Sequence, residues 1–457
     1  MFYGRDQEIR VLNEAYQSND FQFISIFGRR RVGKTTLLKE FQKGKPGIFF
    51  TPKQDYKTSL SHLSRLVFGP GNDAELPLIL KEIVKRSRNC RYLFIVDEYT
   101  RLTHESNDFP RALADTIKNL PEDSQLYIII CGSSVDLMNR ETTEKGKPLY
   151  NMTTGRLMVY PLNPWDSFKA LWGFSQEDAI KIWGMVDGIP YYLERFDPDR
   201  TLTENITRQF LNDCFFEDEA ALALVEEYNK PAMVQSIVDA VANGNMRLSD
   251  IASYCGKETS QTSTSIKYLC DTGILEKYRP VDNPHGKSTR YWMTDHFLKF
   301  WIKRVDDQRD MVRTDNAEAV STKILNSYDE DMDLMFKELC SWYLWNHHHG
   351  EWGTWWGMNP VTRQSEAIDA VVTQVVNGRR IGWFALCFYT DEPIGMPELQ
   401  QLRNRTAMVQ GYDELRYVLF SKVGFKNELF QENVELYTLD NIYNDHTNYV
   451  ITLHDLD

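Results

Sequence analysis

A short apolar run that leads into a glycine-bounded loop constrains this chain more than any other feature. Residues 23–27 read Phe-Ile-Ser-Ile-Phe, and residues 28–35 then match the pattern G-x-x-x-x-G-K-[ST]. In such a loop the glycines let backbone N–H groups close around phosphate, the lysine reaches the β- and γ-phosphates, and the hydroxyl binds Mg²⁺. The sequence therefore predicts a site for a nucleoside triphosphate between a strand and a helix.

We expect the whole loop to take part in binding ATP and Mg²⁺. Lys34 is the candidate phosphate ligand and catalytic cation, and Thr35 is a candidate Mg²⁺ ligand. Three consecutive arginines lie inside the loop, where they contact phosphate or a partner, or are solvated. The expected nucleotide-binding residues of the loop are Gly28, Arg29, Arg30, Arg31, Val32, Gly33, Lys34, Thr35 and Thr36.

A second apolar run, residues 92–96, ends in two acids. We expect Asp97 to hold Mg²⁺ through water and Glu98 to polarise the water that attacks the γ-phosphate. This run follows the phosphate-binding loop closely enough in the sequence for both to belong to one domain. The two motifs together therefore predict an ATPase.

Two further polar residues are candidates for the same chemistry. Ser133 follows the apolar run 126–131 and either senses the γ-phosphate or, like Ser134, caps a helix. Arg156 either stabilises transition-state charge, in cis or from a neighbouring subunit of a homo-oligomer, or is an ordinary surface arginine.

Length and patterning predict several soluble domains. The chain has 457 residues and a formal net charge of −13, which disfavours nonspecific adhesion to nucleic acid over the whole surface. It contains no apolar run of bilayer length and no signal-peptide start, so we expect a cytoplasmic protein without membrane contact. Its seven cysteines are widely spaced without a C-x-x-C pair, which favours reduced, mostly core residues.

The alternation of apolar runs and helical patterns predicts an α/β fold with a parallel sheet and crossover helices. The expected strands of that sheet are residues 23–27, 47–51, 92–96, 126–131 and 157–160. The expected domains are a P-loop ATPase core (1–163), a helical lid (164–228), a winged helix-turn-helix (229–294), a helical linker (295–326) and a mixed α/β domain (327–457).

The winged helix has two alternative roles. Its third helix and the strand that follows, residues 257–277, carry three lysines against three acids, whereas direct DNA contact usually shows clustered Lys and Arg. The wing is more basic, with Lys277, Arg279, Lys287 and Arg290. The module therefore either binds duplex DNA or packs between the ATPase and the C-terminal domain.

Taken together, the opening F-x-G-R at residues 2–5, the phosphate loop, the acidic pair, the G-R at 155–156 and G-I-P at 188–190 resemble the archaeal-type ATPase family of the AAA+/STAND superfamily. The resemblance implies that Tyr3, Gly4 and Arg5 lie near the adenine. It also implies that Pro190, in the lid, approaches the nucleotide.

In relatives of this family the last domain resembles a restriction endonuclease, with acids and a Glu-x-Lys pair around Mg²⁺. Glu338 and Asp369 are at positions where the resemblance places acids, but Leu386 and Phe388 take the Glu and Lys positions. We therefore expect nuclease activity to be lost, unless a lysine from elsewhere replaces the missing one.

A histidine run and several tryptophans lie in the same domain. Residues 347–349 either bind metal or form a solvated helix end, which we favour because consecutive side chains on a helix point in different directions. The tryptophans between residues 342 and 356 either stack on bases or fill a core or interface, which we favour.

These features predict an ATP- and Mg²⁺-dependent molecular switch that acts on an unidentified protein partner. In this interpretation the P-loop core hydrolyses ATP, and nucleotide state repositions the winged helix and the inactive nuclease-like domain. One alternative is a DNA-binding or DNA-processing protein. Another is a scaffold that binds the nucleotide without hydrolysing it.

Overall fold

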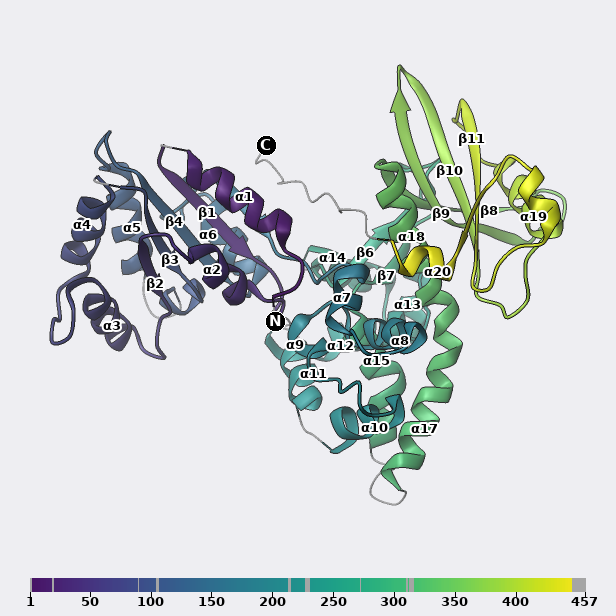
Figure 1. Cartoon of the computed structure of the whole chain (residues 1–457), viewed down its shortest axis with the longest axis horizontal. Coiled ribbons are helices and arrows are strands. Elements are labelled where there is room, and N and C mark those ends of the chain that lie inside the picture. The colour runs from purple at the N-terminus through teal and green to yellow at the C-terminus, as the bar shows by residue number, and fades with distance from the viewer. Residues whose placement is uncertain are drawn as a thin grey trace. The chain divides into compact units, whose positions relative to one another are not determined.

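The computed structural model describes residues 2–18, 20–88, 90–103, 107–212, 215–226, 231–271, 273–309, 311 and 316–445. These residues form two compact units (Figure 1). The first, unit 1, contains the chain up to Leu162 together with Gly188–Tyr192, and the second, unit 2, contains Asn163–Asp187 and the described residues from Leu193 onward.

Unit 1 is built on a five-stranded parallel sheet, which confirms the predicted α/β fold. Its spatial order is β2-β3-β4-β1-β5. The strands are β1 (Gln22–Phe27), β2 (Gly47–Phe50), β3 (Tyr92–Val96), β4 (Leu126–Gly132) and β5 (Gly155–Met158). Only β5 begins more than one residue away from its expected start. Gly155 and Arg156 are not apolar, but they already pair with Ile24 and Ser25 of β1.

Helices cover both faces of this sheet. Successive side chains of a strand point to opposite faces, so neighbouring residues meet different helices. Phe23 packs with residues of α3, α4 and α5, whereas its neighbour Ile24 packs with residues of α1 and α2. The helices of unit 1 are α1 (Asp6–Gln17), α2 (Lys34–Gln42), α3 (Tyr56–Phe68), α4 (Leu76–Ser87), α5 (Asp108–Lys118) and α6 (Val135–Thr143). The sheet is thus buried on both faces, as its near-continuous apolar strands predict.

Unit 2 begins with helices in the region expected to form the lid. They are α7 (Pro164–Ala170), α8 (Gln176–Val186), α10 (Leu202–Ile206) and α11 (Phe215–Glu226). The short α9 (Pro190–Leu193) lies between α8 and α10 in the chain, but its residues up to Tyr192 belong to unit 1. The aromatic residues expected here form part of its core, for example Phe210 stacked on Phe216.

The next part has the predicted order of three helices and a hairpin. These elements are α12 (Pro231–Ala242), α13 (Leu248–Tyr254), α14 (Thr259–Asp271), β6 (Leu275–Tyr278) and β7 (Arg290–Met293). Antiparallel pairing joins Leu275 to Met293 and Tyr278 to Arg290. Residues 229, 230 and 272, which belong to the expected winged helix, lie outside the described residues.

Helices lead on to a C-terminal mixed sheet. They are α15 (His296–Phe300), a π-helical turn (Trp301–Val305), α16 (Asp306–Arg309), α17 (Ala317–Tyr328) and α18 (Met332–His348). Residues 310 and 312–315 of the expected helical stretch from 295 to 317 lie outside the described residues. The long helix expected at 336–345 is longer at both ends than the sequence pattern indicates.

The C-terminal sheet has the order β12-β11-β10-β9-β8. Its elements are β8 (Glu351–Met358), β9 (Ser365–Val376), β10 (Arg379–Phe388), α19 (Met396–Thr406), β11 (Glu414–Ser421), β12 (Glu435–Thr438) and α20 (Leu439–Tyr443). The strands expected at 367–376, 380–389 and 417–421 are present, and the expected helix 398–411 ends earlier, at Thr406.

Two edge strands, β8 and β12, were not predicted. Glycines at 353 and 357 interrupt the alternating pattern of β8, and β12 has only four residues, none of them fully buried. Edge strands have one unpaired side, so tertiary contacts rather than alternation decide them.

Three of the cysteines, Cys131, Cys340 and Cys387, are buried, while Cys90 is exposed and Cys214 lies outside the described residues. Within the described ranges, no helix is both long enough and apolar enough to cross a membrane.

Candidate functional site

The glycine-bounded loop connects β1 to the first turn of α2. Gly28 and Gly33 have φ values of 153° and 96°, in a region that side chains with a Cβ rarely adopt. A Cβ on Gly28 would lie 2.2 Å from the carbonyl oxygen of Val159, so only glycine fits there. Gly33 is the N-cap of α2, and the loop therefore ends where a helix presents its free N–H groups.

The side chain of Lys34 folds back into the loop. Its ammonium donates to the carbonyl oxygens of Gly28 at 2.8 Å and Arg29 at 2.7 Å. Burial lowers the pKa of Lys34, although the nearby Cys131, Glu98 and Asp97 act in the opposite direction. The loop thus holds the buried Lys34 ammonium against its own carbonyl oxygens. An anion that enters the loop can replace these carbonyl oxygens as the partner of the ammonium.

Thr35 and Asp97 lie side by side. The Thr35 hydroxyl donates a 2.7 Å hydrogen bond to the Asp97 carboxylate, which directly follows β3 and is buried. Strand ends meet at one edge of a parallel sheet, which explains why residues 62 positions apart in the chain come together.

This pair fits Mg²⁺. Hydroxyl and carboxylate oxygens are hard ligands, and Mg²⁺ usually takes only one or two from the protein, with the rest from phosphate and water. No group of three or more His, Cys, Asp or Glu side chains suited to a metal occurs among the described residues.

Glu98 continues directly from Asp97. Its backbone is left-handed, with φ 55°, and it precedes the 3-10 turn Tyr99–Leu102. A non-glycine residue in this conformation is uncommon, and such residues cluster at functional sites. Its carboxylate is partly exposed and acts on Lys34 electrostatically, so it belongs to the same site.

The other two candidates differ in surroundings. Ser134, not Ser133, caps α6 by accepting a hydrogen bond from the Leu137 amide at 3.4 Å, so Ser133 stands at the end of β4 without that task. The Arg156 guanidinium donates to the Asn139 side chain and lies 5.2 Å from the Phe27 ring centroid. These contacts give Arg156 a role in joining β5 to β1 and α6.

The residues before α1 contact the loop through the side chain of Arg5. Gly4 and Arg5 both have left-handed backbones, with φ 58° and 70°, and Tyr3 precedes them partly exposed. The Arg5 guanidinium donates to the carbonyl oxygen of Val32 at 2.8 Å and to the Glu8 carboxylate at 2.7 Å. Glu8 was missed by the sequence reasoning, although its spacing of three from Arg5 on a helix is a usable signal.

The turn at residues 188–192 also lies at the loop. Gly188 accepts a 2.6 Å hydrogen bond from the Leu162 amide and has no room for a Cβ, which would lie 1.9 Å from the Leu162 oxygen. Pro190 is next to Gly33: its Cγ would be 3.8 Å from a Cβ placed there. The Arg31 guanidinium lies 4.5 Å from the Tyr191 ring centroid.

In the C-terminal domain the expected acids have different partners. Glu338 pairs with His296 at 2.8 Å, whereas Asp369 lies 3.5 Å from the ammonium of Lys337 and accepts a 3.0 Å hydrogen bond from the Cys387 amide. Lys337 is on α18, so a lysine from elsewhere does approach Asp369.

The residues at the missing Glu-x-Lys positions lie in or against the core. Leu386 is buried, and Phe388 packs against the same apolar cluster.

The histidine run at the end of α18 is partly solvated, because His347 and His349 are exposed and His348 is half-buried. His347 stacks on Tyr343 at 4.2 Å, and His348 stacks on Trp383 at 4.4 Å and contacts Glu435 at 3.1 Å. Their side chains do point in different directions, as a helix requires, but each meets a packed partner.

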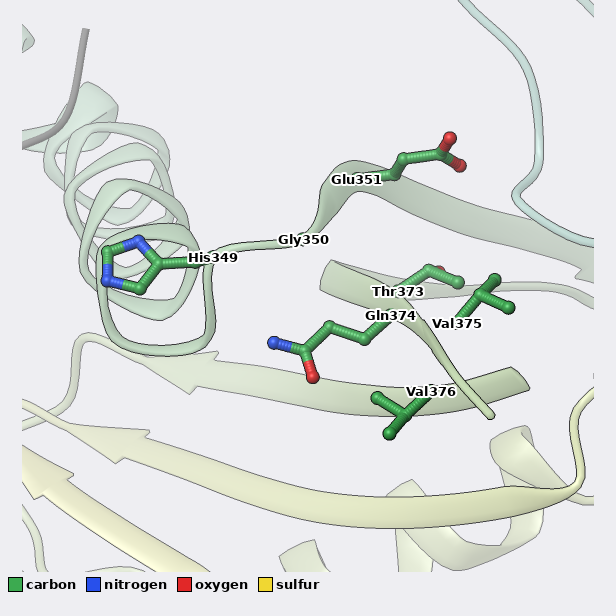
Figure 2. A pocket seen from close by; sticks show the side chains of 7 residues that line it. All are labelled: His349, Gly350, Glu351, Thr373, Gln374, Val375 and Val376. Atoms are coloured by element: carbon green, nitrogen blue, oxygen red, sulfur yellow. The ribbon is translucent and has the colours of Figure 1, made fainter. Parts of the chain in front are cut away.

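A shallow pocket of about 390 Å³ lies beside His349, between the end of α18 and β9 (Figure 2). The Gln374 side chain points across it and donates to the His348 carbonyl. The pocket has no glycine-bounded anion cradle like that of the loop in unit 1.

Comparisons with known proteins agree with this geometry. A family described as an ATPase domain predominantly from Archaea matches residues 2–196. An uncharacterized protein of Methanocaldococcus jannaschii is 30% identical over 322 residues, which cover 67% of this chain and 69% of that protein. An uncharacterized ATP-binding protein of the same organism is 42% identical over 45 residues, covering 10% of this chain and 76% of that protein.

The solved structure of a Walker-type ATPase of Pyrococcus abyssi is similar in fold, with a TM-score of 0.51. It is 20% identical and covers 66% of this chain and 96% of its own.

Proposed function

Because the chain belongs to the archaeal-type ATPase family, we propose that it binds ATP with Mg²⁺ in the loop between β1 and α2 and hydrolyses the γ-phosphate. The observation that carries this proposal is the 2.7 Å hydrogen bond between Thr35 and Asp97, next to the buried Lys34 ammonium. The candidate Mg²⁺ ligands Thr35 and Asp97 are thus next to the phosphate ligand Lys34 at the N-terminus of α2. A complex of a metal ion with a triphosphate requires such neighbouring sites.

Each group then has a distinct task. Lys34 leaves the carbonyl groups of the loop and binds the phosphates. Thr35 and Asp97 would hold Mg²⁺, which would neutralise charge that develops on the phosphate oxygens. Glu98 orients and polarises the attacking water. Ser133, at the end of the neighbouring strand β4, contacts the γ-phosphate or that water.

The remaining candidates contribute through position. The backbone N–H groups of the loop line the phosphates, and Pro190 closes over Gly33 from the lid turn. Tyr3 and Gly4 flank the adenine, which stays an expectation from the family resemblance. Arg156 acts on transition-state charge only if it leaves Asn139, and a subunit contact in a homo-oligomer is one way to achieve this.

We propose that nucleotide state is passed to the winged helix (229–294) and the nuclease-like domain (327–457), with the lid (164–228) and linker (295–326) between them. The support is that the turn at Gly188–Tyr192 groups with unit 1, while the chain on both of its sides belongs to unit 2. A shift of that turn is therefore transmitted directly along the backbone to α8 and α10.

Of the two roles for the winged helix, packing has the stronger support. Arg290 of the wing lies 4.4 Å from the Trp356 ring centroid, and Pro280 bridges to Thr354 of β8. Trp355 donates to Asp282 at 2.8 Å. These contacts hold the wing on β8 and engage Arg290, while Lys277 and Lys287 of the wing are exposed. The partner proposed here is a protein, with duplex DNA as the alternative.

Substitution of Lys34 tests the nucleotide site directly. We expect Lys34→Ala to abolish ATP binding in calorimetry and phosphate release, while Lys39→Ala, an exposed lysine on the same helix, leaves both unchanged. Retained ATP affinity in Lys34→Ala would refute the site. Tight ATP binding by the wild-type chain without phosphate release would favour the non-hydrolysing scaffold.

A further inference from the structure

We infer that Arg5 is a positioning residue that orients the phosphate-binding loop, with Glu8 holding it in place, and that it does not recognise the base. This inference rests on the proposed function of the loop as a nucleotide site. It identifies Arg5 as the group that fixes the backbone of the loop. Neither Arg5 as a loop support nor Glu8 in any role follows from the motifs of the sequence.

The geometry of Arg5 begins with its backbone. Gly4 and Arg5 are consecutive left-handed residues, and Arg5 is the N-cap of α1, whose Ile9 amide donates to the Arg5 carbonyl at 2.9 Å. A left-handed arginine costs conformational energy and persists only where the surroundings favour it. Here the turn carries the Arg5 side chain onto the loop.

Both contacts of the guanidinium are buried. The side chains of Arg5 and Glu8 are 5% and 3% exposed, and their ion pair measures 2.7 Å. The second bond, 2.8 Å long, goes to the carbonyl oxygen of Val32, a fully buried residue of the loop. A buried, charge-assisted bond is stronger and more directional than an exposed one, so it can define the position of a backbone group.

The bonded carbonyl is in the part of the loop that needs an external support. Val32 lies between Arg31 and Gly33, whose φ values are 67° and 96°. In a planar trans peptide the C=O and the following N–H point in opposite directions. Anchoring the Val32 carbonyl on Arg5 therefore directs the Gly33 N–H away from Arg5, where it can serve phosphate at the N-terminus of α2.

Direct contact of Arg5 with a base would require different surroundings. Two of the five N–H donors of the guanidinium bond Glu8 and Val32, and the side chain is only 5% exposed, so little of it is open to a base. Arg5 also lowers the pKa of Lys34 electrostatically, after the larger effect of burial.

The test compares ATP with Mg²⁺-tripolyphosphate, which has the phosphates but no base, by calorimetry on the full chain. In Arg5→Ala we expect the affinity for both ligands to fall by the same factor, about tenfold or more. Glu8→Gln should weaken both in the same ratio, by less. Arg10→Ala, an exposed arginine on the same helix, is the matched control and should change neither.

Two further variants separate positioning from folding. Arg5→Lys keeps the charge but cannot bridge Val32 and Glu8 in the same way, so it should fall between wild type and Arg5→Ala. The double variant Arg5→Ala/Glu8→Gln should lose no more affinity than Arg5→Ala alone, because the two residues act as one unit. Thermal unfolding with no ligand identifies any variant that is unfolded; Arg5→Lys and Glu8→Gln then carry the comparison.

The outcomes are distinct. A loss of ATP affinity with tripolyphosphate affinity unchanged would mean that Arg5 contacts the base, and an unchanged affinity for both ligands would mean that it does not position the loop. Either result overturns the inference. If the wild-type chain binds neither ligand, the proposed function fails first.

Discussion

Glu338 on α18 lies 2.8 Å from the ring Nε2 of His296 on α15, and the imidazole is buried. The ring also packs edge-on against Trp183 of α8, at 4.9 Å between centroids. Glu338, at a position where the resemblance places an acid, thus links α18 to α15, and the imidazole of His296 extends the contact to α8. An acid engaged in such a pair is less available to a metal, which is in line with the expectation from the sequence that nuclease activity is lost.

This pair predicts a pH dependence of stability. Burial alone would lower the pKa of His296, but Glu338 outweighs it and raises the pKa to about 9. The unfolded value is about 6.5, so the stabilisation is complete below that pH and is lost as pH rises through about 9. Urea unfolding between pH 6 and 10 should show a falling midpoint.

Substitutions isolate the cause of that dependence. Glu338→Gln leaves a buried imidazole without its counter-charge, so we expect it to cost about 3 kcal/mol at pH 7 and to remove most of the alkaline decline. His285→Gln, an exposed histidine, serves as the control. A decline of unchanged size in Glu338→Gln would assign it to another group.

Glu98→Gln should separate binding from hydrolysis. The amide keeps the size of the side chain but cannot polarise water as a carboxylate does, and loss of such a group typically costs 10²–10⁴ in rate. We expect phosphate release to fall about 100-fold or more with ATP affinity close to that of wild type. Glu122→Gln is the exposed control, and a Glu98→Gln variant with near-normal turnover would exclude Glu98 as the general base.

Lys337→Met tests the ion pair at Asp369. Burial raises the pKa of Asp369, and Lys337 partly opposes this. Without the ammonium the carboxylate is harder to ionise, so the folded state binds a proton more tightly than the unfolded state and loses stability as pH rises. The difference in unfolding free energy between wild type and Lys337→Met should therefore grow from pH 4 to pH 8, whereas Lys267→Met should show no such trend.

Trp356→Phe tests whether the wing is held on β8. It removes the indole N–H that donates to Ser288 at 2.8 Å and reduces the ring area beneath Arg290, which we expect to cost about 1–2 kcal/mol. Trp172→Phe, at an 88% exposed tryptophan, is the control. Salt-dependent binding of duplex DNA that Arg290→Ala abolishes without loss of stability would instead assign the wing to DNA.

Much of the fold follows from local signals. The strands of unit 1 are buried on both faces and appear as continuous apolar runs, and glycines mark the ends of the loop between β1 and α2. The edge strands β8 and β12 lack such signals, because their conformation depends on pairing with β9 and β11. The same holds for β5, whose first residues are a glycine and an arginine.

The nucleotide site also has features that the sequence predicts and features that it does not. Lys34, Thr35, Asp97 and Glu98 were predicted because phosphate and Mg²⁺ chemistry demands these residue types at these spacings. The contacts of Arg5 with Val32 and of Arg156 with Asn139 were not predictable, since a guanidinium bonds whatever acceptor the fold brings within reach.

By itself the sequence determined that the chain has a phosphate-binding loop after a buried strand and an acidic pair after another. Those motifs are short stretches whose chemistry is local. Only the tertiary structure decided that Thr35 and Asp97 touch, that Arg5 holds the carbonyl of Val32, and that Glu338 pairs with His296. Each of these contacts joins residues that are far apart in the sequence and that come together only in the folded chain. Each also depends on the orientation that a side chain adopts when it is buried.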